Sequence, residues 1–494
     1  MRIPIDRESQ LPLYKQIANF LISEIQSGEL LPATKLPSTR EMALELGINR
    51  ITVSSSYAEL EAKGYIYTRL GSGTYVASPI EDHRSRNKEA QSKTSWPLWQ
   101  QRLLAQSVLP TELERDRIGI STSIKDDVIS FAGGQGAVEL FPADDFRKSL
   151  YTVLLRDKTE ALEYGDYAGY APLRATITHI LASQGIHAQP GNILITTGSQ
   201  QAFALVAGLL LHPGDVILVE SPTYATAIDL FSSLGAQLVG VPVDEYGMQV
   251  DLVEDLLRTV HPKMIYTIPS FQNPTGVSLS GGRRRQLVAL AEHYNVPILE
   301  DEFVGDLRYE GRSQPALKGL DPGGYVIYTG TFSKMLMPGL RVGYLLACGP
   351  VYERLLARKR ITDLATSNLI QRALEAYITV GRYEAHLHRA RRTYRLRRDS
   401  MVAELKNHMP DGTKWITPQG GLFIWVQLPE GVIVNKLYPE ALKEKVDFAP
   451  GSLFYPAEKS FNHIRLNFAM HNPERMAEGI SRLGVAIRRC MRLK

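Results

Sequence analysis

A lysine flanked by hydroxyl-bearing side chains is the most chemically specific feature of this sequence. Residues 331–344 place Lys334 after Ser333 and seven residues before Arg341, among several glycines. A lysine amine forms a Schiff base with an aldehyde cofactor, and a phosphate group needs hydroxyl, backbone and guanidinium donors close to the attachment point. The segment therefore predicts a pyridoxal phosphate site around Lys334.

Polar and aromatic residues follow two upstream apolar runs. Ser199 and Gln200 come after the run at 192–197 and open a helical stretch, where backbone N–H groups and the helix N-terminus attract phosphate. Tyr224 follows the run at 215–220 and can lie against a planar ring. Each signal is weak alone, and a lone Tyr224 would more often be a core residue.

Two further residues match the functions of a pyridine ring. Asn273 lies in a proline-bounded turn and can donate to a phenolate oxygen, while Asp301 ends an apolar run and can pair with a protonated ring nitrogen. An isolated Asp301 would more often be a capping or ion-paired residue. The ordered set argues for the cofactor because it supplies each group that the cofactor needs: Ser199, Tyr224, Asn273, Asp301, Lys334 and Arg341.

Strand-like runs alternate with helical patterns over this part of the chain. The clearest runs are residues 192–197, 215–220, 264–268, 297–301 and 325–329. Such alternation predicts an α/β domain with a mostly parallel sheet, in which ligands bind beyond the carboxyl ends of the strands.

The first part of the chain has a different pattern. Apolar spacing and capping residues predict helices over 13–27, 38–47 and 49–64, followed by a hairpin over 65–76. Three helices and a two-stranded wing make a winged helix-turn-helix, whose third helix enters the DNA major groove by its N-terminal end. The less favoured alternative is a small interaction domain whose polar helix face is exposed to solvent and does not bind DNA.

Polar residues on the second and third helices and the wing are positioned to reach bases or phosphates. They are Arg40, Asn49, Arg50, Thr52, Ser54, Arg69, Gly71 and Gly73.

Composition limits the broad class of protein. The 494 residues carry a net charge of +4, and the segment 1–78 balances its acidic and basic residues, so charge alone does not indicate nucleic-acid binding. We expect no membrane span, no metal site and, with only Cys348 and Cys490, a cytoplasmic location. A basic run at 389–398 lies in a helical pattern and is expected to be a solvated face rather than a polyanion contact.

The N-terminal segment resembles the GntR family of bacterial regulators over about the first 78 residues. The resemblance lies in residues 28–30, 36–40, 51–53, 64–66 and 71–76, together with Tyr57 and Leu60. Family members usually have Ser or Thr before the recognition-helix arginine, whereas this chain has Asn49, so the family's base preference does not transfer.

The remainder resembles the fold type I aminotransferases, and the fusion resembles the MocR/GabR subfamily of GntR regulators. The resemblance implies a winged helix-turn-helix over 1–78, a linker over 79–117 and an aminotransferase-like effector and dimerisation domain over 118–494. It also implies Lys334 as the Schiff-base lysine, Asp301 at the pyridinium, Asn273 on the ring oxygen and Tyr224 on the ring. Around the phosphate it places Ser199, Gln200, Ser333 and Arg341.

Two roles follow from the resemblance alone. Tyr164 would reach the phosphate in the partner subunit of a homodimer, and Arg465 would bind the carboxylate of an amino acid. One position departs from the family, because Phe303 replaces the tyrosine that commonly hydrogen-bonds the ring oxygen. Cofactor binding should survive this change, whereas fast turnover is in question.

These features favour a transcriptional regulator that binds operator DNA and senses an amine, an amino acid or pyridoxal phosphate itself through aldimine chemistry at Lys334. The alternative is a pyridoxal phosphate-dependent aminotransferase with an accessory DNA-binding domain, since the retained groups leave half-transamination chemically possible. A scaffold with an inactive pocket is the least favoured interpretation. The sequence names neither the effector nor the operator.

Overall fold

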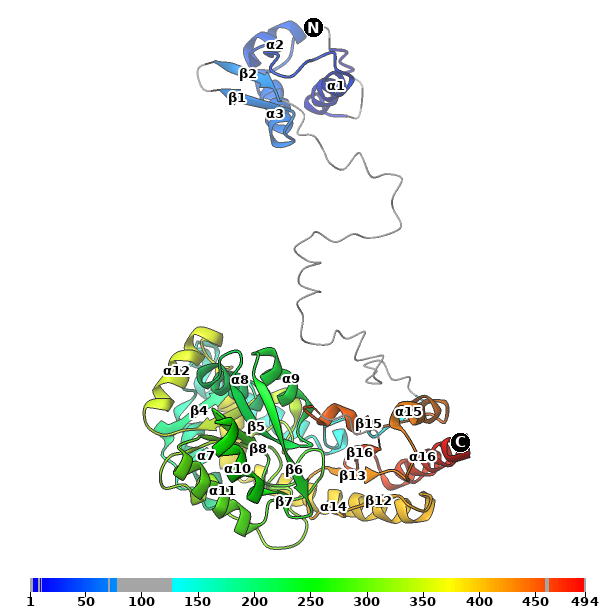
Figure 1. The fold of residues 1–494 in the computed structure, drawn as a ribbon. Helices are drawn as coiled ribbons and strands as arrows, with labels where there is room; N and C mark the ends of the chain where they lie inside the picture. The colour runs from blue at the N-terminus through cyan, green and yellow to red at the C-terminus, as the bar shows by residue number, and fades with distance from the viewer. Residues whose placement is uncertain are drawn as a thin grey trace. The chain divides into compact units, whose positions relative to one another are not determined.

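The computed structural model describes residues 3–7, 9, 11–69, 72–77, 127–457 and 462–492. The chain forms two compact units, one N-terminal and one C-terminal (Figure 1). The predicted linker over 79–117 lies outside the described residues, so the domain boundaries stay a prediction.

The N-terminal unit consists of three helices and a hairpin, as the sequence predicts. The elements are α1 (Leu13–Ser27), α2 (Thr39–Leu46), α3 (Arg50–Ala62), β1 (Ile66–Arg69) and β2 (Gly73–Val76). Ser38 and Glu41 form the expected capping box at the start of α2. Gly28 ends α1 in the left-handed conformation, at φ 85°, which glycine adopts without strain.

A small apolar core holds these elements together. Ile17 and Leu21 of α1 and Val53 and Leu60 of α3 are fully buried. The hydroxyl of Tyr57 donates to the backbone oxygen of Pro37, 2.8 Å away, and so joins α3 to the segment before α2. The exposed face of α3 is thereby fixed relative to α2.

The C-terminal unit is built on an eight-stranded sheet in the order β4-β11-β10-β9-β8-β5-β6-β7. Its strands are β4 (Ile193–Thr196), β5 (Val216–Ser221), β6 (Gln237–Asp244), β7 (Gly247–Met248), β8 (Met264–Thr267), β9 (Ile298–Glu302), β10 (Val326–Thr331) and β11 (Gly343–Leu346). Only β11 and β7 pair antiparallel to their neighbours. The five predicted strands are present and run in one direction, which confirms the mostly parallel sheet.

Helices connect and cover these strands. They include α6 (Ala143–Asp157), α7 (Ala171–Ser183), α8 (Ser199–Leu210), α9 (Ala225–Ser233), α10 (Val250–Val260), α11 (Gly281–Tyr294), α12 (Pro350–Asp363) and α13 (Asn368–Thr379). Helix α8 packs against β4, β9, β10 and β11. Its first turn therefore lies beside the carboxyl ends of the central strands.

A second, antiparallel sheet was not expected from the sequence. It has the order β12-β13-β16-β15 and consists of β12 (Lys414–Trp415), β13 (Phe423–Gln427), β15 (Ala449–Pro450) and β16 (His463–Asn467). Helices α14 (Arg382–His408), α15 (Val434–Lys443) and α16 (Pro473–Arg492) accompany it (Figure 1). A further pair, β3 (Ile129–Ser130) and β14 (Val446–Asp447), ties residues after 127 to this region.

The predicted basic helix is present as part of α14, but the expectation of a solvated face is wrong for two of its arginines. Arg397 and Arg398 are 5% and 3% exposed. Arg397 donates to the backbone oxygen of Ala469 at 2.5 Å, and Arg398 donates to that of Pro418 at 2.9 Å. These arginines join α14 to neighbouring loops. Across the described residues, no helix has the length and apolarity needed to span a bilayer.

Candidate functional site

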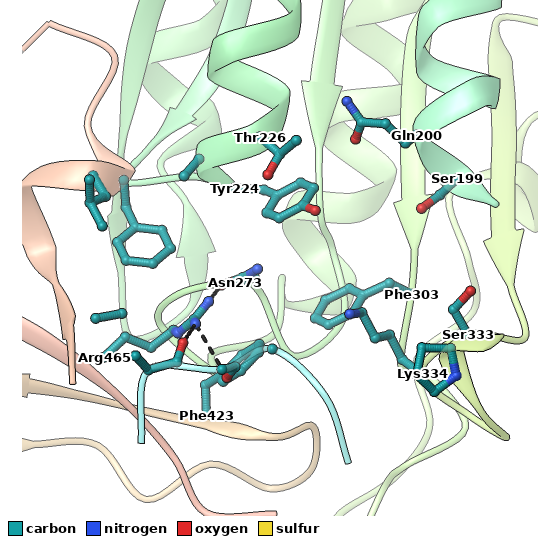
Figure 2. Close-up of a pocket in the computed structure, with 18 of the residues that line it drawn as sticks. Ser199, Gln200, Tyr224, Thr226, Asn273, Phe303, Ser333, Lys334, Phe423 and Arg465 are labelled. Carbon is teal, nitrogen blue, oxygen red and sulfur yellow. Dashed lines mark hydrogen bonds between the residues drawn. The ribbon is translucent and has the colours of Figure 1, made fainter. Parts of the chain in front are cut away.

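A pocket of about 580 Å³ opens at the carboxyl ends of the parallel strands. The second sheet closes it through Phe423 of β13 and Arg465 of β16. Figure 2 shows side chains from both parts of the unit directed into this space. The sequence-predicted residues that line the pocket are Ser199, Gln200, Tyr224, Asn273, Asp301, Ser333, Lys334, Arg341 and Arg465.

Lys334 follows β10 and lines the pocket beside Gly134. Burial lowers the pKa of its amine, and the charges of Arg465 and Arg341 lower it further. A lowered pKa increases the neutral fraction of the amine, which is the nucleophilic form. Lys334 is therefore suited to attack an aldehyde carbon.

Asp301 of β9 has one satisfied and one unsatisfied carboxyl oxygen. The hydroxyl of Tyr266 donates to Oδ2 at 2.8 Å, whereas the buried Oδ1 has no hydrogen-bond partner. Burial raises the pKa of Asp301 to about 7, against the opposing effects of the Tyr266 hydrogen bond and the Lys334 charge. A buried acceptor without a donor is costly. A protonated pyridine nitrogen would supply that donor, so the carboxylate fits pyridoxal phosphate.

A cradle of hydrogen-bond donors lies between α8 and the turn after Lys334. Helix α8 begins after Gly198, at φ 104°, and no side chain caps its first N–H groups. The guanidinium of Arg341 donates to the backbone oxygen of Thr197 at 2.9 Å and to the hydroxyl of Ser333 at 3.4 Å. Free helix N–H groups, hydroxyls and a guanidinium together form an anion site.

A Cβ atom at Gly198 would lie 2.9 Å from the Arg341 guanidinium, in a backbone conformation that disfavours side chains. Gly198 therefore allows the cradle to close, although the sequence-based prediction did not include it.

Two aromatic rings border the space where a flat cofactor would lie. Tyr224 precedes α9, and burial raises the pKa of its hydroxyl. Phe303 is 7% exposed and stacks on Phe423 with 6.3 Å between ring centroids. In Figure 2 the rings of Tyr224 and Phe303 both face the pocket. The residue that departs from the aminotransferase pattern thus lies at the site and contributes no hydroxyl.

Arg465 is a buried cation without an acidic partner in the described part of the chain. Its Nη1 donates to Oδ1 of Asn273 at 2.9 Å, and its Nη2 donates to the backbone oxygen of Ala132. Its buried Nε has no hydrogen-bond partner. Burial lowers the pKa of Arg465 to about 10. The guanidinium lies over the rings of Phe423 and Phe454, 4.2 and 5.0 Å from their centroids. An unpaired guanidinium in such a place is suited to a ligand carboxylate.

The hydrogen bond from Arg465 also orients Asn273, because it uses the carbonyl oxygen of that side chain. The amide N–H groups of Asn273 remain as donors, which is the role that the sequence analysis expected.

A buried network that was not predicted supports the Asn273 turn. Glu220 accepts hydrogen bonds from Thr267 at 2.6 Å and from Gln272 at 3.0 Å, and Gln272 in turn accepts from Thr275 at 2.6 Å. Burial raises the pKa of Glu220 to about 7. The sequence feature that could have indicated this network is Glu220 itself, an acidic residue at the end of an apolar run.

Tyr164 does not line the pocket within one chain. Its side chain is 89% exposed and borders a separate hollow with Leu162 and Ser367. Its expected role in a partner subunit stays a prediction.

The N-terminal unit presents most of the predicted DNA-contacting residues at its surface. Arg40, Asn49, Arg50, Ser54 and Arg69 are exposed. Gly71 lies outside the described residues. These positions belong to α2, the first turns of α3 and the hairpin (Figure 1).

Several of these side chains already have structural partners. The side-chain oxygen of Asn49 accepts from the backbone N–H of Ile51 at 2.9 Å and so caps α3. Arg50 donates through Nε to the hydroxyl of Thr39 at 3.3 Å. Thr52 is only partly exposed. Gly73, at φ 123°, takes a conformation that favours glycine and lies against Lys35, so its place in the hairpin has a structural reason.

Comparison with family models identifies both units. Residues 127–483 match aminotransferase class I and II, and residues 13–76 match the gntR family of bacterial regulatory proteins.

Known relatives resemble either the whole chain or its C-terminal unit. The chain is 32% identical to the uncharacterized HTH-type transcriptional regulator YdfD of Bacillus subtilis, with 99% of each chain covered. It is 38% identical to aromatic-amino-acid aminotransferase 1 of Thermococcus litoralis, over 74% of this chain and 89% of that protein.

Among solved structures, Pyrococcus horikoshii kynurenine aminotransferase in complex with PMP superimposes with a TM-score of 0.74 at 37% identity, over 79% of this chain and 97% of that one. The C-terminal fold is therefore one that binds pyridoxal phosphate in its relatives. The full-length match and the two family domains lead to one conclusion: the chain belongs to the MocR/GabR subfamily of GntR transcriptional regulators, in which a helix-turn-helix domain is fused to an aminotransferase-like domain.

Proposed function

We propose that this regulator holds pyridoxal phosphate at Lys334, senses a primary amine that carries a carboxylate, and converts ligand binding into a change in its occupancy of operator DNA. The observation that carries the proposal is a pair of unsatisfied charged groups in one pocket. The Oδ1 of Asp301 lacks a donor and Arg465 lacks an anion, and both residues line the same pocket as Lys334.

The residues that would hold the cofactor divide into three groups. Asp301, oriented by Tyr266, would accept from the ring nitrogen; Asn273 would donate to the ring oxygen. Tyr224 would lie against the ring. The first turn of α8 with Ser199, Gln200, Ser333 and Arg341 would bind the phosphate.

Lys334 supplies the sensing group in this proposal. Pyridoxal phosphate supplies an aldehyde carbon at which one amine can replace another. The Lys334 amine would be covalently held without ligand and released when a ligand amine binds, while Arg465 fixes the ligand carboxylate. Release of the Lys334 side chain would thus be the local structural change that the ligand produces.

A regulatory effect requires that the ligand favour one arrangement of the protein over another. A homodimer would place two winged helices on DNA and so require two half-sites or a direct repeat. Exposed apolar side chains of α6, including Tyr151 and Leu155, are consistent with a covered face there.

Cofactor attachment is tested by adding pyridoxal phosphate to the purified protein and recording the visible absorbance. The wild type should become yellow, and borohydride reduction followed by peptide mass spectrometry should locate the cofactor on Lys334. Lys334→Ala should show neither signal. Lys443→Ala, which removes an exposed lysine that does not line the pocket, is the matched control and should behave as wild type. A colourless wild type would contradict the proposal.

DNA binding is tested by footprinting the region upstream of the protein's own gene. Specific protection that changes with an amine ligand would support the regulator. Robust transamination without specific protection would favour the second candidate.

That second candidate is an aminotransferase with an accessory DNA-binding domain. The retained Lys334, Asp301, Asn273 and Arg465 favour it, because they leave transamination chemically possible. Steady-state transamination of amino acids, assayed beside the footprinting, separates the two functions.

A further inference from the structure

Ile51 departs from the burial pattern of its helix. The other large apolar residues of α3, namely Val53, Tyr57 and Leu60, are buried in the core of the N-terminal unit. The side chain of Ile51 is 72% exposed, although it lies in the first turn of the helix. It therefore contributes little to the core of this unit.

The neighbours of Ile51 in this turn are partly committed to the fold. Asn49 uses its side-chain oxygen to cap the helix, and Arg50 uses Nε to contact Thr39. Ile51 instead borders a shallow hollow with Arg50, Ser54, Ser55 and Ala58. An apolar side chain stands here among hydroxyls and a guanidinium, on the part of α3 that would face bases.

The major groove offers one apolar group to such a side chain. Among the four bases only thymine presents a methyl group on its major-groove edge, and apolar side chains recognise it by contact. We propose that Ile51 contacts the methyl group of a thymine in each half-site and so determines the preferred base at that position. This inference rests on the proposed binding of operator DNA by α3.

Exposure alone does not single out Ile51, because isolated apolar residues are common on protein surfaces. Leu44 of α2 is 88% exposed in the same unit. The two residues differ in place, since Leu44 lies late in α2 and Ile51 lies in the helix turn that enters the groove. Leu44 is therefore the matched control.

The test replaces thymine by uracil, which removes only the methyl group. The full-length protein first selects binding sites from a random double-stranded DNA library. Each thymine of the selected half-site is then replaced singly by uracil and the dissociation constant is measured. We expect one position at which uracil weakens binding by about fourfold, the effect of one methyl group no longer withdrawn from water.

Variants assign that effect to Ile51. Ile51→Ala should bind the thymine and uracil sites equally, whereas Ile51→Val and Leu44→Ala should keep the difference. Because Ile51 is exposed, Ile51→Ala should unfold at the wild-type temperature, which thermal denaturation checks.

Three outcomes would overturn the inference: a selected site without thymine, uracil substitutions that are all neutral, or a uracil effect that persists in Ile51→Ala. Failure to enrich any sequence would overturn specific DNA binding itself, and the inference with it. A failure of the base reading is thus distinguishable from a failure of the proposed function.

Discussion

The pocket of the C-terminal unit and the DNA-facing surface of the N-terminal unit use charged residues in opposite ways. In the pocket, Asp301 and Arg465 are 2% and 6% exposed, and each has a buried polar atom without a partner. On the DNA-facing surface, Arg40, Arg50 and Arg69 are exposed to water. A buried, unpaired charge destabilises a fold, whereas an exposed one costs little.

The two sites therefore differ in how narrowly they select what binds. Unsatisfied groups in the pocket specify the chemistry of what should bind, namely a protonated ring nitrogen and a carboxylate. The surface arginines suit a phosphate and the edge of a guanine equally, so their exposure does not specify which of the two they bind. An apolar side chain such as Ile51 is more selective, because only thymine offers a methyl group in the major groove.

Replacing Asp301 by Asn should have the largest effect. The substitution keeps the size of the side chain but removes the charge that would pair with the ring nitrogen. Cofactor affinity should fall by about 3 kcal/mol or more, roughly two orders of magnitude, as for loss of one partner of a buried charge pair. Spectroscopic titration with pyridoxal phosphate measures it. Asp255→Asn, on an exposed helix face, is the control and should bind normally.

Replacing Arg465 by Gln should weaken carboxylate ligands selectively. Phenylalanine and phenethylamine are a suitable pair of probes, since Phe448, Leu453 and Phe454 line the pocket. The variant should lose about 2 kcal/mol of affinity for phenylalanine and none for phenethylamine, as followed by the absorbance change of the bound cofactor. Equal losses for the two probes would show that Arg465 does not bind the carboxylate.

Glu302 is a half-buried acid that does not line the ligand pocket, and one of its carboxyl oxygens lacks a partner. Its Oε1 is buried without a partner, and burial raises its pKa to about 8. Between pH 4.5 and 8 the folded protein keeps this proton and the unfolded chain releases it, so stability should fall as pH rises.

One such proton makes the free energy of unfolding fall by up to about 1.4 kcal/mol for each pH unit. Glu302→Gln should remove that contribution, which denaturant unfolding at several pH values measures. An unchanged slope in the variant would mean that Glu302 is ionised in the folded protein.

Replacing Arg69 by Ala should have the smallest effect. Arg69 lies on the hairpin over the ring of Tyr67, 5.6 Å from its centroid, and is exposed. If it contacts one phosphate, the slope of log affinity against log salt should become shallower by about 0.9. The loss should be similar for specific and non-specific DNA. A change in base preference would instead place Arg69 at a base edge.

The groups around the cofactor space could be predicted because they follow successive parallel strands. Ser199, Tyr224, Asn273, Asp301 and Lys334 each come after or at the end of a strand, and these ends meet at one edge of the sheet. The position of each residue relative to its strand was therefore enough to predict that these side chains lie close together.

The supporting residues could not be predicted in this way. Tyr266 lies inside an apolar run and looks like an ordinary strand residue, although it orients Asp301. Glu220 stands out as an acidic residue at the end of its run, but the sequence does not show that it supports the Asn273 turn. The second sheet was missed because two of its four strands, β12 and β15, are only two residues long and are too short to show any periodicity. Its arginine, Arg465, was identified only through the family resemblance.

The burial of Arg397 and Arg398 was missed for a related reason. Helical spacing shows which residues share a face, but not which loops will cover it. Their acceptors belong to loops at Ala469 and Pro418, distant in sequence.

We propose that chemistry at Lys334 controls DNA binding. The most direct test measures the affinity of the cofactor-loaded wild type for its selected operator, with and without a saturating amine ligand. We predict a change of about 5-fold to 150-fold, the usual range of coupling between sites. The ligand should leave the operator affinity of Lys334→Ala unchanged. A wild type whose operator affinity ignores every ligand that alters the cofactor absorbance would contradict the account.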